Sequence, residues 1–114
     1  MNYKILIADD EKNVLKMLTT VFSHAGNQIA CADNGKDALR LFKQDKPDIV
    51  LMDIRMPEMS GIESLQLMRK FDADTPIILM TAYAAVETAV EALRLGAFDY
   101  VIKPFELDEL KLLM

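Results

Sequence analysis

The chain has 114 residues, the usual size of one domain, and a 52% hydrophobic composition that is sufficient for a buried core. Its formal net charge of -5, from 18 acidic and 13 basic residues, argues against direct contact of this domain with nucleic acid or an anionic membrane. The single cysteine excludes an intramolecular disulfide, and the first apolar run is too short for a signal peptide or a membrane span, so we expect a soluble protein of the reducing cytoplasm.

Predicted strands and helices alternate along the chain. Short apolar runs predict strands at residues 5–8, 29–32, 49–52, 77–80 and 100–102. The four stretches between them carry apolar residues at the spacing of one helical face, and two of these stretches end near Gly26 and Gly96. In chain order the predicted faces contain Val14, Leu18, Val21 and Phe22; Ala38, Leu41 and Phe42; Ile62, Leu65 and Met68; and Val86, Ala89, Val90 and Leu93.

The last predicted helix begins in residues 107–114, LDELKLLM, and its pattern stops without a helix-ending signal. We therefore expect one domain, residues 1–114, that is truncated within its last helix and is followed by more chain in the natural protein.

The strand segments are continuously apolar, which indicates that both faces of the sheet are buried. Burial on both faces requires helices above and below a parallel sheet, joined by right-handed crossovers. The sequence therefore predicts a doubly wound α/β domain. In such folds functional groups collect beyond the carboxyl ends of the strands, so the residues that follow each strand are the candidates for a site.

Charged and polar side chains follow four of the predicted strands. Asp9 and Asp10 come after the first strand, Asp53 after the third, Thr81 after the fourth and Lys103 after the fifth. Carboxylates brought together repel one another unless a cation joins them, and a few carboxylates with open water positions are a typical Mg²⁺ site. Because Mg²⁺ usually shares its shell with phosphate oxygens, the set indicates phosphoryl transfer.

Within this set Asp53 is the best candidate nucleophile. It directly follows a buried strand segment that we expect to be central, and Lys103 and Thr81 could contact arriving phosphoryl oxygens by charge and by hydrogen bonding. Taken singly, Asp9 and Asp10 could instead stabilise the start of a helix, and Asp53 could be a turn residue. Their coincidence with Thr81 and Lys103 at strand ends favours a site.

These residues lie in motifs that resemble response-regulator receiver domains. The acidic pair Asp9-Asp10, the segment LMDIRMPEMSG around Asp53, MTAY with Thr81 and VIKPF with Lys103 occur in the order and spacing of that family, and the resemblance covers the chain from end to end. It implies a flavodoxin-like (βα)5 fold with a five-stranded parallel sheet in strand order 2-1-3-4-5.

The resemblance also implies roles for individual residues. Asp53 would be the phosphoacceptor, assisted by Thr81 and Lys103. Asp10, Asp53 and the backbone carbonyl of Arg55 would bind Mg²⁺ directly, and Asp9 would act through water.

A switch is implied as well. Thr81 and Tyr100 would form the switch pair, although Tyr100 could simply pack in the core. The Lys103–Pro104 peptide bond would be cis, which Pro104 makes accessible, and would aim Lys103 at the site.

The segment TAYAAVETAVEALRLGAFDYVIKPFELDEL is most similar to receivers of the nitrogen regulatory protein C type. This implies a sensor histidine kinase as phosphoryl donor, C-terminal ATPase and DNA-binding modules that control transcription, and a possible homodimer. A free-standing phosphorelay receiver is the alternative.

Three other functions fit the sequence less well. The acidic first loop would repel the phosphate of FMN, and it has no glycine-rich turn for a nicotinamide dinucleotide. A phosphatase of the haloacid dehalogenase type would need a second acid where this chain has Arg55. Two local expectations remain: Ser60 caps the third helix, and Cys31 is a small buried residue.

Overall fold

The computed structural model describes residues 2–82 and 86–103, in which strands and helices alternate as predicted. The fifth helical segment and Pro104 lie outside the described residues. In chain order the elements are β1 (Lys4–Ala8), α1 (Lys12–His24), β2 (Gln28–Ala32), α2 (Gly35–Asp45), β3 (Ile49–Asp53), α3 (Gly61–Phe71), β4 (Ile77–Ala82), α4 (Val86–Arg94) and β5 (Asp99–Lys103).

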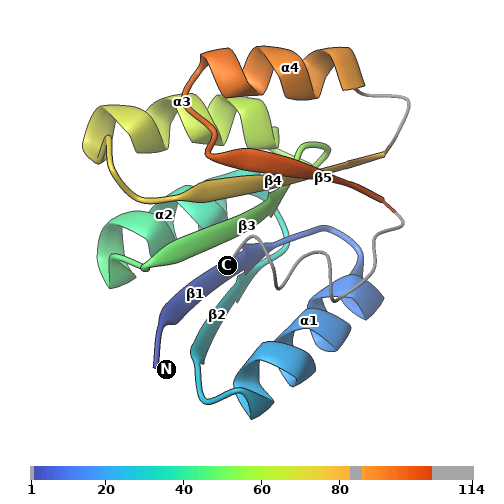
Figure 1. Cartoon of the computed structure of the whole chain (residues 1–114), viewed down its shortest axis with the longest axis vertical. Helices are drawn as coiled ribbons and strands as arrows, with labels where there is room; N and C mark the ends of the chain where they lie inside the picture. The colour runs from blue at the N-terminus through green and yellow to red at the C-terminus, as the bar shows by residue number, and fades with distance from the viewer. Residues whose placement is uncertain (1, 83–85, 104–114) are drawn as a thin grey trace.

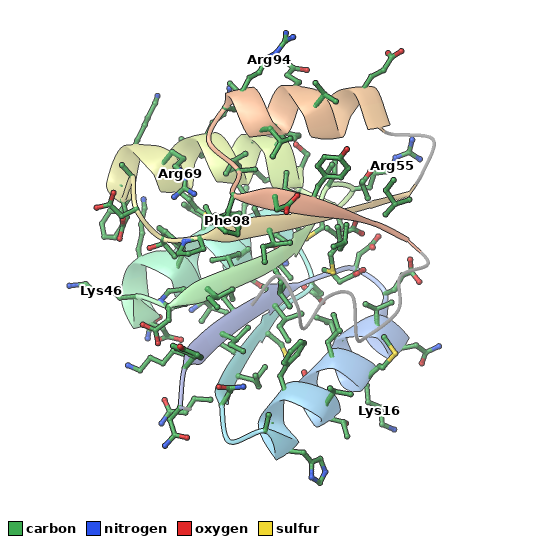
Figure 2. The ribbon with its side chains drawn as sticks, viewed as in Figure 1. Lys16, Lys46, Arg55, Arg69, Arg94 and Phe98 are labelled. Atoms are coloured by element: carbon green, nitrogen blue, oxygen red, sulfur yellow. The ribbon has the colours of Figure 1, made fainter. Side chains whose placement is uncertain are left out.

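The five strands form one parallel sheet in the order β2-β1-β3-β4-β5. Helix α1 covers one face of the sheet, and α2, α3 and α4 cover the other (Figure 1). Side chains such as Lys16 on α1 and Arg94 on α4 project outward on opposite sides of the molecule (Figure 2). Both the doubly wound fold and the strand order are confirmed.

Alternation along the strands divides the core between the two faces. In β1, Ile5 and Ile7 pack with Leu18 and Phe22 of α1, whereas Leu6 packs on the side of α2 and α3. All five residues of β3 are buried, as expected for a central strand covered on both faces. Full burial of each large apolar side chain contributes about 1.5–3 kcal/mol to folding, so the sheet is a rigid support for the residues at its edge.

Side chains cap the N-termini of α2 and α3. Asn34 accepts a hydrogen bond from the Asp37 backbone N–H at 2.8 Å, and Ser60 accepts one from the Glu63 N–H at 3.2 Å. Each cap satisfies an N–H that has no partner within its helix, typically worth about 1 kcal/mol. The predicted cap at Ser60 is confirmed.

Two local predictions were wrong. Cys31 is exposed, because β2 is an edge strand whose side chains are only partly covered. In α4, Ala92 is buried, and Leu95 just after the helix packs against the core, whereas Val90 and Leu93 are 42% and 38% exposed. Apolar residues surround much of α4, so their spacing did not identify the inward face. No helix within residues 2–82 and 86–103 is long and apolar enough to cross a membrane.

Candidate functional site

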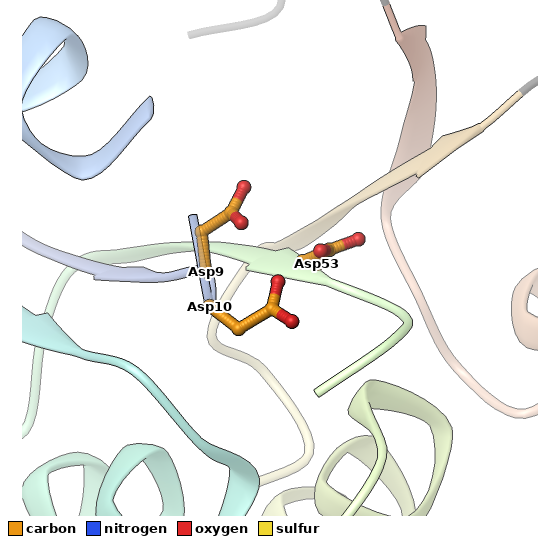
Figure 3. Close-up of side chains that lie close together, drawn as sticks. All are labelled: Asp9, Asp10 and Asp53. Atoms are coloured by element: carbon orange, nitrogen blue, oxygen red, sulfur yellow. The ribbon is translucent and has the colours of Figure 1, made fainter. Parts of the chain in front are cut away.

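The three predicted aspartates meet at the carboxyl ends of β1 and β3. One carboxylate oxygen from each of Asp9, Asp10 and Asp53 lies within 4.8 Å of the other two, and the three side chains lie close together (Figure 3). Asp9 and Asp53 are buried, whereas Asp10 is exposed. The site is therefore anchored in the protein on one side and accessible from solvent on the other.

Backbone hydrogen bonds fix the acidic pair. The Asp9 N–H donates to the Ala32 carbonyl at 3.0 Å, which extends the pairing of β1 with β2 by one residue. The Asp9 carboxylate accepts the Glu11 N–H at 2.9 Å, which holds the turn that leads into α1. Asp9 is thus oriented by the backbone, and Asp10 at the next position is left on the solvent side.

Asp53 is the last residue of β3 and is only 6% exposed. The Ile54 N–H donates to the Met80 carbonyl at 3.0 Å, so pairing with β4 continues just beyond Asp53. The Gly61 N–H then donates to the Ile54 carbonyl at 2.8 Å, which closes residues 54–60 into a compact loop. We call residues 54–60 the site loop. The site loop begins at the carboxyl end of β3, directly after Asp53, and returns to the same place at Gly61.

The three carboxylates favour binding of a cation. Two unit negative charges no more than 4.8 Å apart repel by at least about 3 kcal/mol at an effective dielectric constant of 20, before solvent screening of the exposed Asp10 is considered. A divalent cation removes this repulsion, and carboxylate oxygens are the ligands that hard cations such as Mg²⁺ prefer. The donor set therefore fits Mg²⁺ chemically.

The neighbouring strands bring the other predicted residues to the same edge. Thr81 lies near the end of β4 and is 1% exposed. Lys103 ends β5, where its backbone pairs in register with Ala82. The side chain of Lys103 lies outside what the structure describes, so its predicted aim at the site stays a prediction.

Comparison with known proteins decides the family. Residues 5–114 match the family described as the response regulator receiver domain. The chain is a response regulator receiver domain. It is 64% identical to the regulatory protein AtoC of Escherichia coli K12 over 97% of this chain, which agrees with the resemblance to nitrogen regulatory protein C type receivers.

Two further similarities concern shorter proteins. The receiver domain is 40% identical to sporulation initiation phosphotransferase F of Bacillus subtilis over 97% of this chain and 90% of that protein. It superimposes on the receiver domain of Francisella response regulator 1452 with a TM-score of 0.89 and 37% identity, over 97% of this chain and 92% of that one. By contrast, the chain spans 24% of the length of AtoC.

The structure places Tyr100 and Arg55, but it does not test their predicted roles. Tyr100 is partly buried and packs against the core on the face of the sheet that α2, α3 and α4 cover. Its contacts match core packing, and its role as a switch stays a prediction. Arg55 is exposed in the site loop, and coordination by its carbonyl is likewise a prediction. Pro104 lies outside the described residues.

Three small residues beside the site were not predicted from the sequence: Gly35, Gly61 and Ser64. A Cβ at Gly61 would lie 2.9 Å from the Ile54 Cα, so α3 can approach the end of β3 only with glycine there. A Cβ at Gly35 would likewise collide with the backbone of Met59. The hydroxyl of the buried Ser64 donates a hydrogen bond to the Gly35 carbonyl. Small residues at the starts of α2 and α3 were the available signal.

Proposed function

We propose that this receiver domain accepts a phosphoryl group on Asp53 from the phosphohistidine of a sensor kinase in a Mg²⁺-dependent reaction. The observation that carries the proposal is the convergence of Asp9, Asp10 and Asp53 oxygens within 4.8 Å at the carboxyl ends of adjacent strands. A buried carboxylate beside two others fits a nucleophile that works with a bound cation.

In the proposed reaction a carboxylate oxygen of Asp53 attacks phosphorus. A phosphorus–oxygen bond forms, the phosphorus–nitrogen bond to the kinase histidine breaks, and its electron pair remains on the imidazole. The product is an acyl phosphate on Asp53. Asp53 suits this role because its strand is buried on both faces, which fixes the attacking oxygen relative to the incoming group.

Asp10, Asp53 and the Arg55 carbonyl would hold Mg²⁺ directly, and Asp9 would act through water. When bound, the ion supplies positive charge that screens the carboxylates and the incoming phosphoryl oxygens. Asp9 contributes orientation, because its carboxylate is already held by the Glu11 N–H at 2.9 Å.

The phosphoryl group would then act as a switch through Thr81, Lys103 and Tyr100. Phosphorylation adds nearly two negative charges and three strong acceptors, which the Thr81 hydroxyl and the Lys103 ammonium can contact. Tyr100 would follow Thr81 inward and change the face formed by α4 and β5. A shift from about 1:99 to 99:1 between two states requires roughly 5.5 kcal/mol of differential interaction.

The wider role follows from the relatives. We infer that the domain belongs to a cytoplasmic transcription regulator with C-terminal ATPase and DNA-binding modules, as its resemblance to receivers of the nitrogen regulatory protein C type implies; the match to 24% of the length of AtoC is consistent with this. A free-standing phosphorelay receiver is the second candidate, favoured by the match to 90% of sporulation initiation phosphotransferase F. The sequence of the complete gene product distinguishes the two.

Intact-mass measurement tests the reaction. The protein is incubated with Mg²⁺ and a small acyl-phosphate donor, and we expect one phosphoryl adduct that Asp53→Asn abolishes. Asp74→Asn is the matched control, because Asp74 is exposed on the α3–β4 connection, away from the cluster. Steady release of phosphate without an adduct would instead indicate a phosphatase, and an adduct retained in Asp53→Asn would contradict the proposed acceptor.

A further inference from the structure

The first turns of α2 and α3 both pack against the site loop. A Cβ added to Gly35, the first residue of α2, would lie 2.6 Å from the Met59 carbonyl carbon and 2.7 Å from the Met59 Cβ. Such distances are too short for real Cβ atoms, so the absence of a side chain at Gly35 is what lets α2 pack directly on the loop backbone. We call Gly35, Met59 and Ser64 the α2–α3 junction.

A buried hydrogen bond closes the α2–α3 junction. Ser64 is fully buried, with 0% exposure, and its hydroxyl donates to the Gly35 carbonyl at 3.0 Å. Gly35 and Ser64 are 29 positions apart, so this bond joins the start of α2 to the first turn of α3. At the opposite ends of the same helices Phe42 and Phe71 meet edge to face, with ring centroids 6.1 Å apart.

The site loop is consequently held from two sides. Its end is fixed by Gly61, which sits against the Asp53 backbone, and Met59 is fixed by Gly35 of α2. If α2 moved away from α3, the Met59 backbone would lose its support and the loop could relax away from the acidic residues. The Ser64 hydroxyl opposes that separation, because its loss removes a buried hydrogen bond at the point where the two helices meet the loop.

We propose that Ser64 is a positioning residue for the acidic site, which acts through Gly35 and Met59 to set the geometry of the site loop. The proposal rests on the proposed function, since the loop matters to chemistry only if Arg55 and Asp53 take part in Mg²⁺ binding and phosphoryl acceptance. Ser64 itself does not touch the reacting atoms. Ser64 holds the site loop in the conformation that binds Mg²⁺. This lowers the entropic cost of ordering the loop when Mg²⁺ binds.

The test compares Ser64→Ala with a control of similar stability. Ser64→Ala should weaken Mg²⁺ binding by about three- to tenfold, the effect expected for the loss of one hydrogen bond, and slow phosphorylation by a small-molecule donor by a similar factor. Mg²⁺ affinity is measured by titration with MgCl₂ followed by NMR, and phosphorylation by intact mass. Ile5→Val is the control, because Ile5 is buried in the other core cluster, on the α1 face, and its shortening costs a comparable amount of stability.

Gly35→Ala provides a second variant that keeps the hydroxyl. Its new methyl group would displace the Met59 backbone, so it should weaken Mg²⁺ binding at least as much as Ser64→Ala. Amide hydrogen exchange should become faster in the site loop of both variants, but not in Ile5→Val.

The outcomes separate this proposal from the proposed function. If Ser64→Ala and Ile5→Val lose similar stability while both keep wild-type Mg²⁺ affinity and phosphorylation rate, Ser64 is merely structural and the assignment is wrong. If the wild-type protein neither binds Mg²⁺ nor forms an adduct, the proposed function fails, and this assignment fails with it.

Discussion

At the residue scale, Gly61 determines how closely α3 can approach Asp53. Its N–H bonds to the Ile54 carbonyl at 2.8 Å, and a Cβ there would lie 3.0 Å from the Asp53 carbonyl carbon. The backbone of Asp53 cannot yield easily, because it belongs to a strand whose residues are all buried. A side chain at position 61 must therefore displace the start of α3, the end of β3 or both.

Gly61→Ala should lower the free energy of unfolding by about 1–3 kcal/mol and slow adduct formation on Asp53 more than stability loss explains. Urea denaturation and intact mass after incubation with the acyl-phosphate donor measure the two effects. Ile62→Ala, which removes partly buried volume at the next position, is the control. Equal phosphorylation rates for Gly61→Ala and the wild type would show that Asp53 tolerates the displacement.

At the element scale, Arg69 connects the carboxyl ends of α3 and α4. Its Nε donates to the Gly96 carbonyl at 2.8 Å and its guanidinium donates to the Asp72 carbonyl at 3.2 Å, so one cation serves two helix ends (Figure 2). Gly96 has φ +111°, and a Cβ there would also press against the Arg69 side chain. Partial burial lowers the pKa of Arg69, and Asp72 and Asp74 oppose that shift by favouring its charge.

Arg69→Ala should destabilise the end of α4 selectively. We expect a loss of about 1–2 kcal/mol, because two hydrogen bonds from a partly exposed cation are removed. Amide exchange should accelerate at residues 95–97, and Lys70→Ala, on the exposed neighbouring position, should leave it unchanged. Uniform acceleration across all strands would mean that Arg69 supports global rather than local stability.

The order of elements could be predicted from the sequence, but their mutual contacts could not. The apolar run at residues 49–52, for example, is short and is followed directly by Asp53, so both the strand and its functional end can be recognised from the local sequence. The bond between Ser64 and Gly35 spans 29 positions and leaves no local pattern. The inward face of α4 was misassigned because Val90 and Leu93 are apolar yet exposed, and exposure depends on what packs beside the helix.

At the scale of the whole molecule, the parallel sheet assembles residues that are far apart in the sequence. Asp10 and Asp53 come together because β1 and β3 are adjacent and end at the same edge, a consequence of the strand order. Thr81 and the backbone of Lys103 reach that edge on β4 and β5. The family resemblance supplied the roles of these residues, whereas the geometry supplies their proximity.

Chemical mapping of the phosphorylated residue shows directly which of the three carboxylates accepts the phosphoryl group. The protein is phosphorylated with a small acyl-phosphate donor in Mg²⁺ or in EDTA, the acyl phosphate is reduced with borohydride, and peptides are sequenced by mass spectrometry. We expect reduction of Asp53 to homoserine in Mg²⁺, and little or none after the metal is removed. Homoserine at Asp9 or Asp10 instead, or equal labelling of Asp53 in EDTA, would contradict it.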